Sequence, residues 1–157
     1  MKTLRYKISI DSDIKRNQKN FERDVHKILT NKKSWPINFI IDNNHYDFEI
    51  ILTPAKKVEY TCHFKGLSCA DIYNKKIYIN NYRWTKGAKP SELSLQDYRI
   101  YLINHEVGHI LGLGHSKPIK NRKVPVMNQH TLGIKPGKPY MWPLPQEKKI
   151  IEKLFKN

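Results

Sequence analysis

Residues 105–115 have the sequence HEVGHILGLGH, in which three histidines and one acid stand among small and apolar residues. His105 and His109 are four residues apart, so a helix places both imidazoles on one face, where they can bind one metal ion. Gly112 can adopt a positive φ that ends the helix and turns the chain back, and His115 then supplies a third nitrogen. Three protein ligands leave one tetrahedral position for water, as in catalytic zinc sites. Because Glu106 lies beside the first ligand and can hold that water, the segment predicts one catalytic Zn²⁺ ion.

The residues before this motif predict the helix that it needs. Ser94 and Asp97 resemble a capping box, with Asp97 in the position usually held by Glu or Gln. The residues that then recur at steps of three and four are Leu95, Tyr98, Leu102, His105 and His109. We therefore predict a helix over 95–111. Gly108 within it costs about 1 kcal/mol relative to alanine, which indicates that another segment packs closely there, beside the metal.

Length and composition indicate a globular domain with a strong positive charge. The 157 residues are enough to bury a core, and we expect a single domain over 1–157. No apolar run is long enough to span a bilayer, and residues 1–10 predict a first strand rather than a signal peptide. There are 29 Lys and Arg residues against 14 Asp and Glu residues, a formal net charge of +15. This charge attracts acidic substrates, anionic glycans or nucleic acid. However, the basic residues are spread along the chain, which favours the simpler interpretation that they solvate the surface.

Hydrophobic periodicity predicts a small α+β fold. The predicted strands are 6–10, 39–41, 48–52 and 77–79, and an amphipathic helix is predicted over 18–30. Residues 118–145 are rich in Pro, Gly and Lys and predict a long ordered loop. Pro145 then begins a short C-terminal helix, with an apolar stripe made of Ile150, Ile151, Leu154 and Phe155. Strands and helices in this order indicate the α+β class.

The two cysteines, Cys62 and Cys69, are close in sequence. They can close a small loop as a disulfide, which suits an oxidising compartment. A metal site built on these two cysteines has no further cysteine to support it. A pair of free thiols in a cytosolic protein is the remaining alternative, and we favour the disulfide.

The zinc motif together with Met127 resembles the metzincin clan of zinc endopeptidases. Residues 125–128, Pro-Val-Met-Asn, lie where the clan has a methionine-containing turn that forms a hydrophobic floor below the metal. Ser116, directly after the third histidine, is similar to the matrixin branch. The chain is more similar to a mainly actinobacterial family of metzincin-like domains over roughly its last hundred residues. The segments that carry this resemblance are 81–84, 97–104, 124–133 and Trp142-Pro143, with the paired-cysteine loop.

The resemblance implies a metzincin-like catalytic domain. Its twisted, mostly parallel sheet has an antiparallel edge strand, with the active-site helix beneath it and a C-terminal helix. It also implies that strand 77–80 is the sheet edge along the cleft, where a substrate adds as an antiparallel strand, and that residues 126–140 form the lower wall. The N-terminal extension and further cysteines of that family are not found in this sequence. The compartment therefore stays undetermined, although the family resemblance and the disulfide favour a secreted protein.

The function that these residues predict is zinc-dependent endopeptidase activity. A zinc-bound water, activated by Glu106 as general base, attacks the peptide bond, and Glu106 passes the proton to the leaving amine. Some metzincins have a tyrosine two residues after the turn methionine, and this chain has Gln129 there. Gln129 could donate a hydrogen bond to the oxyanion, with His130 as its rival, but a structural role is favoured for both.

Two other classes of function stay open. A zinc hydrolase of a non-peptide amide would use the same metal chemistry. A basic binding module stabilised by zinc would fold and bind its partner without Glu106. Recognisable nucleic-acid-binding motifs are absent from the sequence. We therefore expect a peptide or protein substrate, with acidic substrates as one option, and a monomeric protein.

Overall fold

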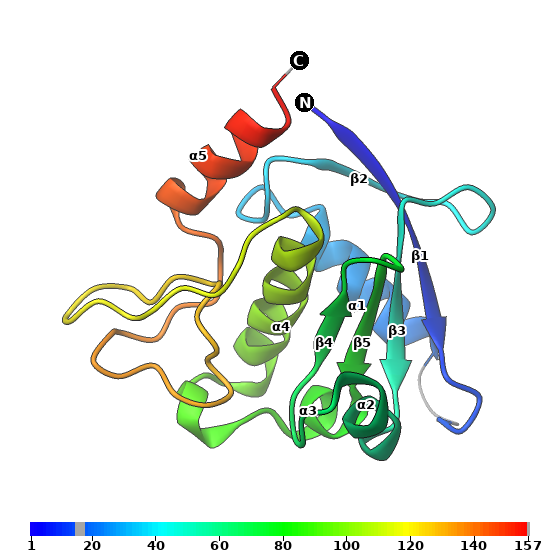
Figure 1. Cartoon of the computed structure of the whole chain (residues 1–157), viewed down its shortest axis with the longest axis horizontal. Helices are drawn as coiled ribbons and strands as arrows, with labels where there is room; N and C mark the ends of the chain where they lie inside the picture. The colour runs from blue at the N-terminus through cyan, green and yellow to red at the C-terminus, as the bar shows by residue number, and fades with distance from the viewer. Residues whose placement is uncertain (15–17, 157) are drawn as a thin grey trace.

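The structure, a computed structural model, describes residues 1–14 and 18–156. Within these residues five strands form one sheet in the order β2-β1-β3-β5-β4 (Figure 1). The strands are β1 (Thr3–Ile10), β2 (Asn38–Ile41), β3 (Phe48–Thr53), β4 (Cys69–Asp71) and β5 (Lys76–Asn80). All pairings are parallel except that of β4 with β5. The predicted fold class, with a mostly parallel sheet and an antiparallel edge strand, is confirmed.

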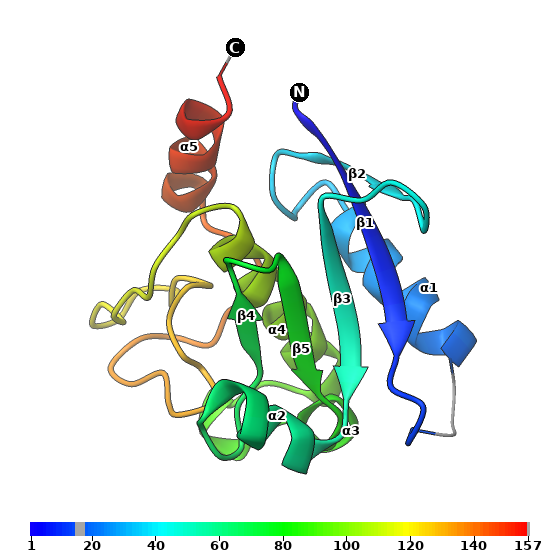
Figure 2. The same cartoon turned by 45° about the vertical axis from the view of Figure 1, so that its right-hand side comes forward.

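Two long helices cover one face of this sheet. Helices α1 (Gln18–Leu29) and α4 (Leu95–Ile110) lie side by side there, α1 behind β1 and α4 near β4 and β5 (Figures 1 and 2). The remaining helices are α2 (Ala55–Cys62) after β3, α3 (Asn81–Lys86) after β5, the 3₁₀ turn η1 (Lys89–Ser91), and α5 (Pro145–Leu154). None of the helices in the described residues has the length and apolar character needed to cross a membrane.

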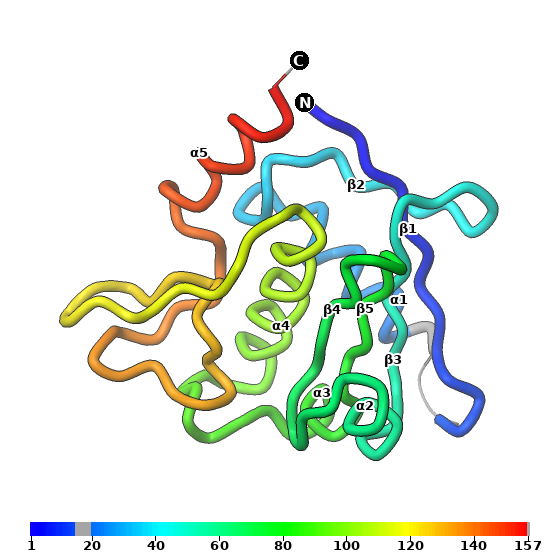
Figure 3. Tube along the Cα trace, in the orientation of Figure 1, coloured from blue at the N-terminus to red at the C-terminus, as the bar shows by residue number. Residues whose placement is uncertain are grey.

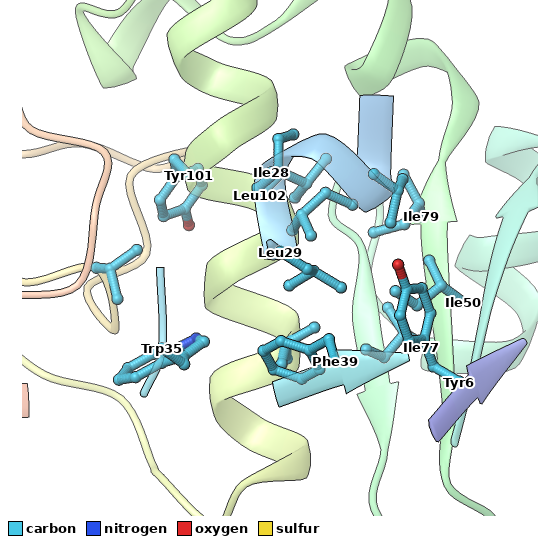
Figure 4. Close-up of a cluster of buried hydrophobic side chains, with 14 of the residues drawn as sticks. Tyr6, Ile28, Leu29, Trp35, Phe39, Ile50, Ile77, Ile79, Tyr101 and Leu102 are labelled. Atoms are coloured by element: carbon cyan, nitrogen blue, oxygen red, sulfur yellow. The ribbon is translucent and has the colours of Figure 1, made fainter. Parts of the chain in front are cut away.

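The main hydrophobic core lies between the sheet and these two helices (Figure 4). Ile50 of β3 pairs with Ile77 of β5, and both side chains are fully buried. Leu29 of α1 and Leu102 of α4 are buried in the same core. Each such side chain contributes about 1.5–3 kcal/mol when it leaves water. The core therefore fixes α4 firmly against the sheet.

Helix α4 begins and ends where its sequence pattern predicts. It runs over Leu95–Ile110, and the Ser94 side chain caps it by accepting a hydrogen bond of 3.2 Å from the backbone N–H of Asp97. The apolar repeat places Tyr98 and Leu102 in the core. The predicted helix over 95–111 is thus confirmed to within one residue.

The edge strand is not the one that the family resemblance implied. Strand β5 contains the predicted residues 77–80, but it lies between β3 and β4, so the edge is β4. Strand β4 has only three residues, Cys69, Ala70 and Asp71, without the β-branched or aromatic alternation that predicts a strand. Its extended conformation depends on pairing with β5. Helix α2, which precedes β4 in the chain, was also not predicted from the sequence.

The C-terminal helix buries only part of the apolar stripe that was predicted. Ile151 is fully buried and Phe155 packs partly buried against the core, as predicted, whereas Ile150 and Leu154 are 48% and 58% exposed. The inward face contains Glu147, Ile151 and Phe155, which follow one another at steps of four residues. A stripe of apolar residues therefore overestimated the buried face and missed its buried acid.

Residues 118–144, all of which the structure describes, contain no helix or strand, as predicted for the long loop. They form two extended loops beside α4, drawn in yellow and orange in Figure 3. An isolated bridge between Lys123 and Lys138 joins the two loops. Val126, Met127 and Ile134 are buried, so this segment packs as a wall rather than projecting freely.

Candidate metal centre

The three histidines of the motif converge at the C-terminal end of α4. His105 and His109 lie on one face of the helix, and Gly112, with φ of +109°, turns the chain back to His115. One nitrogen from each ring lies within 4.8 Å of the other two. The Nε2 atoms of His109 and His115 are 3.2 Å apart. The structure thus places together the three residues that the sequence predicts as metal ligands.

Backbone carbonyl groups orient two of the rings. The Nδ1 atom of His105 is 2.8 Å from the oxygen of Val126, and that of His109 is 2.8 Å from the oxygen of Leu113. A carbonyl oxygen only accepts, so each Nδ1 carries the proton and each Nε2 keeps its lone pair. Burial lowers the pKa of all three histidines, including His115, and favours the neutral imidazoles that bind metals. Three converging neutral nitrogens fit a Zn²⁺ ion.

Glu106 brings a buried acid to the same place. Its side chain is 3% exposed and lines the same cleft as the histidines. Burial raises the pKa of Glu106 to about 8. A carboxyl group with a pKa near neutrality can both accept and release a proton at physiological pH, as general acid–base chemistry requires.

The cleft in front of these groups, here called the metal cleft, has a volume of about 590 Å³. One side is the edge strand β4, through Cys69 and Ala70, and the other is the loop segment with Gln129 and Leu132. Further lining residues are Phe64, Leu67, Ser68, Ile72, Tyr101, Leu102 and Thr131. Cys62 and Cys69 form a disulfide that ties α2 to β4. Because β4 rather than β5 is the edge strand, β4 is the strand that borders the metal cleft.

Gly108 allows the methionine segment to approach α4 closely. A Cβ atom on Gly108 would lie 3.0 Å from the Trp35 ring and nearer still to the Met127 sulfur. Met127 is 1% exposed, and its sulfur packs against α4 at Gly108, the residue before His109. Trp35 was not predicted to be there, and its indole N–H donates to the Asn104 carbonyl at 3.0 Å.

We expect Gly108→Ala to lower the free energy of unfolding by about 1–2 kcal/mol, because overpacking outweighs the gain in helix propensity. The matched control is Gly114→Ala, since a Cβ atom at Gly114 has no neighbour within 4 Å. Urea unfolding of the two variants compares them directly. A Gly108→Ala protein at least as stable as the parent would mean that the packing against Trp35 and Met127 is looser than described.

Glu147 is a residue of the site that sequence reasoning missed. It is 5% exposed, and its carboxylate accepts hydrogen bonds from the backbone N–H groups of Val126 (3.1 Å), Met127 (3.0 Å) and Leu144 (2.9 Å). The Val126 carbonyl orients His105, as described above. The Met127 carbonyl accepts from the N–H of Ser116, the residue after His115, at 2.9 Å. Because the Val126 carbonyl and the Met127 N–H belong to one peptide group, Glu147 fixes the group that orients His105. The Met127 carbonyl that holds Ser116 belongs to the next peptide group.

One sequence signal could have identified Glu147. It is the only acid between residues 107 and 151, and it lies at the third position of α5, where acids cap helices. An isolated acid in a basic stretch suggests a specific role. The capping pattern alone, however, does not reveal that its oxygens also reach the methionine segment.

Gln129 and His130 lie in different environments. Gln129 is half-buried and lines the metal cleft. His130 is fully buried and stacks on Tyr101 at 4.0 Å. Its Nε2 is 2.9 Å from the Tyr140 carbonyl oxygen, and its Nδ1 is 3.2 Å from the Asn128 amide nitrogen. The same Nδ1 is 2.9 Å from the Asn128 carbonyl oxygen, and burial lowers the pKa of His130 to about 4, which favours the neutral ring. Its polar atoms are thus used inside the loop wall.

Comparisons with known proteins agree with this architecture at the level of the fold. No curated protein matches the sequence. Among solved structures, the fold is similar to that of archaemetzincin from Methanopyrus kandleri, with a TM-score of 0.59 and 16% sequence identity. The similarity covers 98% of this chain and 96% of the archaemetzincin chain. Over residues 1–150 the sequence matches the family described as "Protein of unknown function (DUF3152)". The chain therefore belongs to the DUF3152 family.

Proposed function

We propose that this protein is a zinc-dependent endopeptidase of the metzincin type, formed by a single domain over 1–157. The observation that carries the proposal is the convergence of His105, His109 and His115 beside the buried carboxyl of Glu106, in a cleft bordered by a sheet edge. The similarity of the fold to archaemetzincin, whose name refers to the same clan, supports it. The buried Met127, which packs against α4 at Gly108, is consistent with the turn that the resemblance implies.

The three histidines would hold one Zn²⁺ ion. When bound there, the ion supplies Lewis-acid activation of a carbonyl group and of water. Glu106 takes a proton from the attacking water at its carboxylate and returns it to the leaving amine. Positioned groups of this kind typically accelerate a reaction by about 10²–10⁴-fold. Gln129, on the opposite wall of the metal cleft, could donate a hydrogen bond to the carbonyl oxygen as negative charge develops there.

Strand β4 would bind the main chain of the substrate. It is the last strand of the sheet and lines the metal cleft through Cys69 and Ala70. An extended peptide can add to such an edge through backbone hydrogen bonds, with little demand on its side chains. This feature favours a peptide over a small non-peptide amide. The disulfide between Cys62 and Cys69 is compatible with a secreted protein.

The proposal is tested by incubating the zinc-loaded protein with an unbiased peptide library and reading the products by mass spectrometry. We expect internal cuts that disappear with a zinc chelator and return when zinc is added back. Cuts that persist without metal would contradict the proposal. A zinc-loaded protein that leaves every peptide intact, yet hydrolyses small acyl-amides, would instead support the non-peptide alternative.

N-methylation of a cleaved peptide tests how it binds. An N-methyl group removes one backbone donor, so we expect cleavage to slow strongly when the methyl lies at alternate residues, the period of a β-strand. Rates at the intervening positions serve as the matched control, and kcat/KM is measured for each peptide. An equal effect at all positions would exclude strand addition to β4.

A further inference from the structure

A second hollow opens next to the metal cleft and shares a wall with it. It has a volume of about 800 Å³ and lies between η1 and the loop segment 128–135. Gln129 and Leu132 line both hollows. An extended chain that passes the metal ligands can therefore continue over these two residues into the second hollow.

The wall between the two hollows is held rigidly. The Asn128 side-chain amide donates to the Gly133 carbonyl at 3.0 Å, and the N–H of Leu132 donates to the Gln129 carbonyl at 3.0 Å. From below, the hydroxyl of Tyr101 accepts from the N–H of His130 at 3.0 Å. Because these bonds fix both ends of the segment, the passage between the hollows keeps its shape.

The loops that form this region carry basic residues and no acid. Between residues 107 and 146 there are six Lys and Arg residues and no Asp or Glu. All six are exposed, and none takes part in the ion pairs found among the described residues. One of them, Lys135, lines the second hollow together with Lys89 of η1, and the only acid there is the exposed Glu92. We call this second hollow the basic hollow.

We propose that the basic hollow binds an acidic stretch of the substrate, a few residues away from the bond that is cleaved. This inference rests on the proposed peptidase function and names the substrate class. Lys89 and Lys135 provide the positive charge, while Pro90, Pro118 and Ile134 offer apolar contact to the stems of Asp or Glu side chains. The lining contains no aromatic residue on which bases could stack. An acidic peptide therefore fits this hollow better than a single-stranded nucleic acid.

The test uses peptides that share one cleavable bond. In one series a Glu-Asp pair is moved one position at a time away from the bond, and in the other a Gln-Asn pair replaces it. We expect kcat/KM to be about 5- to 20-fold higher for the acidic pair at one set of positions, since one surface charge pair supplies about fivefold. The preference should vanish in 1 M salt, where the screening length falls to about 3 Å.

Charge reversal shows whether the basic hollow causes this preference. The double substitution Lys89→Glu with Lys135→Glu should abolish or invert it. The matched control is Lys149→Glu with Lys153→Glu on α5, which changes the net charge equally at two exposed residues outside both hollows. Thermal unfolding of both variants checks that they remain folded, because substitutions at such surface positions usually change stability by less than about 0.5 kcal/mol.

The outcomes separate this inference from the function on which it rests. Cleavage without an acidic preference, or a preference that falls equally in both double variants, would overturn the inference alone. The inference would also be overturned if a single-stranded oligonucleotide inhibited cleavage, the variant with Lys89→Glu and Lys135→Glu relieved this inhibition, and the parent showed no acidic preference. If the zinc-loaded parent protein cleaves no peptide at all, the proposed function fails and the inference fails with it.

Discussion

Replacing Glu106 with glutamine should lower the rate of peptide cleavage by about 10²–10⁴-fold, because the general base is lost. Glutamine has nearly the shape of the protonated acid, and the carboxyl group is buried with its pKa raised to about 8. The fold and the histidines should therefore be unaffected. The expected result is a protein with the parent's zinc content and thermal stability but with kcat reduced by this factor.

The matched control for this variant is Glu59→Gln, which changes the same group at an exposed position of α2. It should leave kcat unchanged. A Glu106→Gln protein that cleaves as fast as the parent would show that Glu106 is not the base. A loss of zinc in the same variant would mean that the carboxyl also holds the metal.

Replacing Glu147 with glutamine should give the largest loss of stability. The carboxylate accepts three backbone hydrogen bonds, and the amide offers one oxygen and two donors in its place. At least one buried N–H group is then left without an acceptor, which costs about 1–3 kcal/mol. Because the Met127 N–H belongs to the peptide group whose carbonyl orients His105, zinc affinity should fall as well, by about 10–100-fold if Glu147 acts like other outer partners of metal ligands.

The control lies on the same helix. Glu152 is exposed, so Glu152→Gln should change neither the midpoint of urea unfolding nor the zinc dissociation constant. Zinc competition with a chromogenic chelator measures the affinity in both variants. A Glu147→Gln protein that loses stability but binds zinc as tightly as the parent would limit Glu147 to a structural role. Full stability in this variant would contradict the hydrogen bonds described here.

The parts of the site that the sequence predicts are those set by local spacing. In a helix, His105 and His109 must lie on one face, and the cap at Ser94 fixes where that helix starts. The turn at Gly112 is also local, since only its own backbone conformation brings His115 back. These features depend on residues within one motif, so the pattern of residues was sufficient to predict them.

The features that were missed depend on contacts between distant segments. Glu147 is 21 residues from Val126, and Trp35 is 69 residues from Asn104, whose carbonyl it contacts. No periodicity within one element reports such pairs. Strand β4 is a similar case, because three residues carry too little pattern to predict a strand and only the neighbouring β5 defines it. The burial of Glu147 also explains why the apolar stripe of α5 was only partly correct, since Ile151 and Phe155 face the core but Ile150 and Leu154 do not.

The most direct test of this account is a titration of metal-free protein with zinc while the cleavage of one library-derived peptide is followed. The account predicts that activity rises in proportion to added zinc and reaches its plateau at one ion per chain. His109→Ala, which removes one of the three nitrogens, should not recover activity at the same zinc concentration. Full activity in the metal-free protein, or one tightly bound zinc ion per chain with no cleavage of a peptide that other zinc peptidases accept, would contradict it.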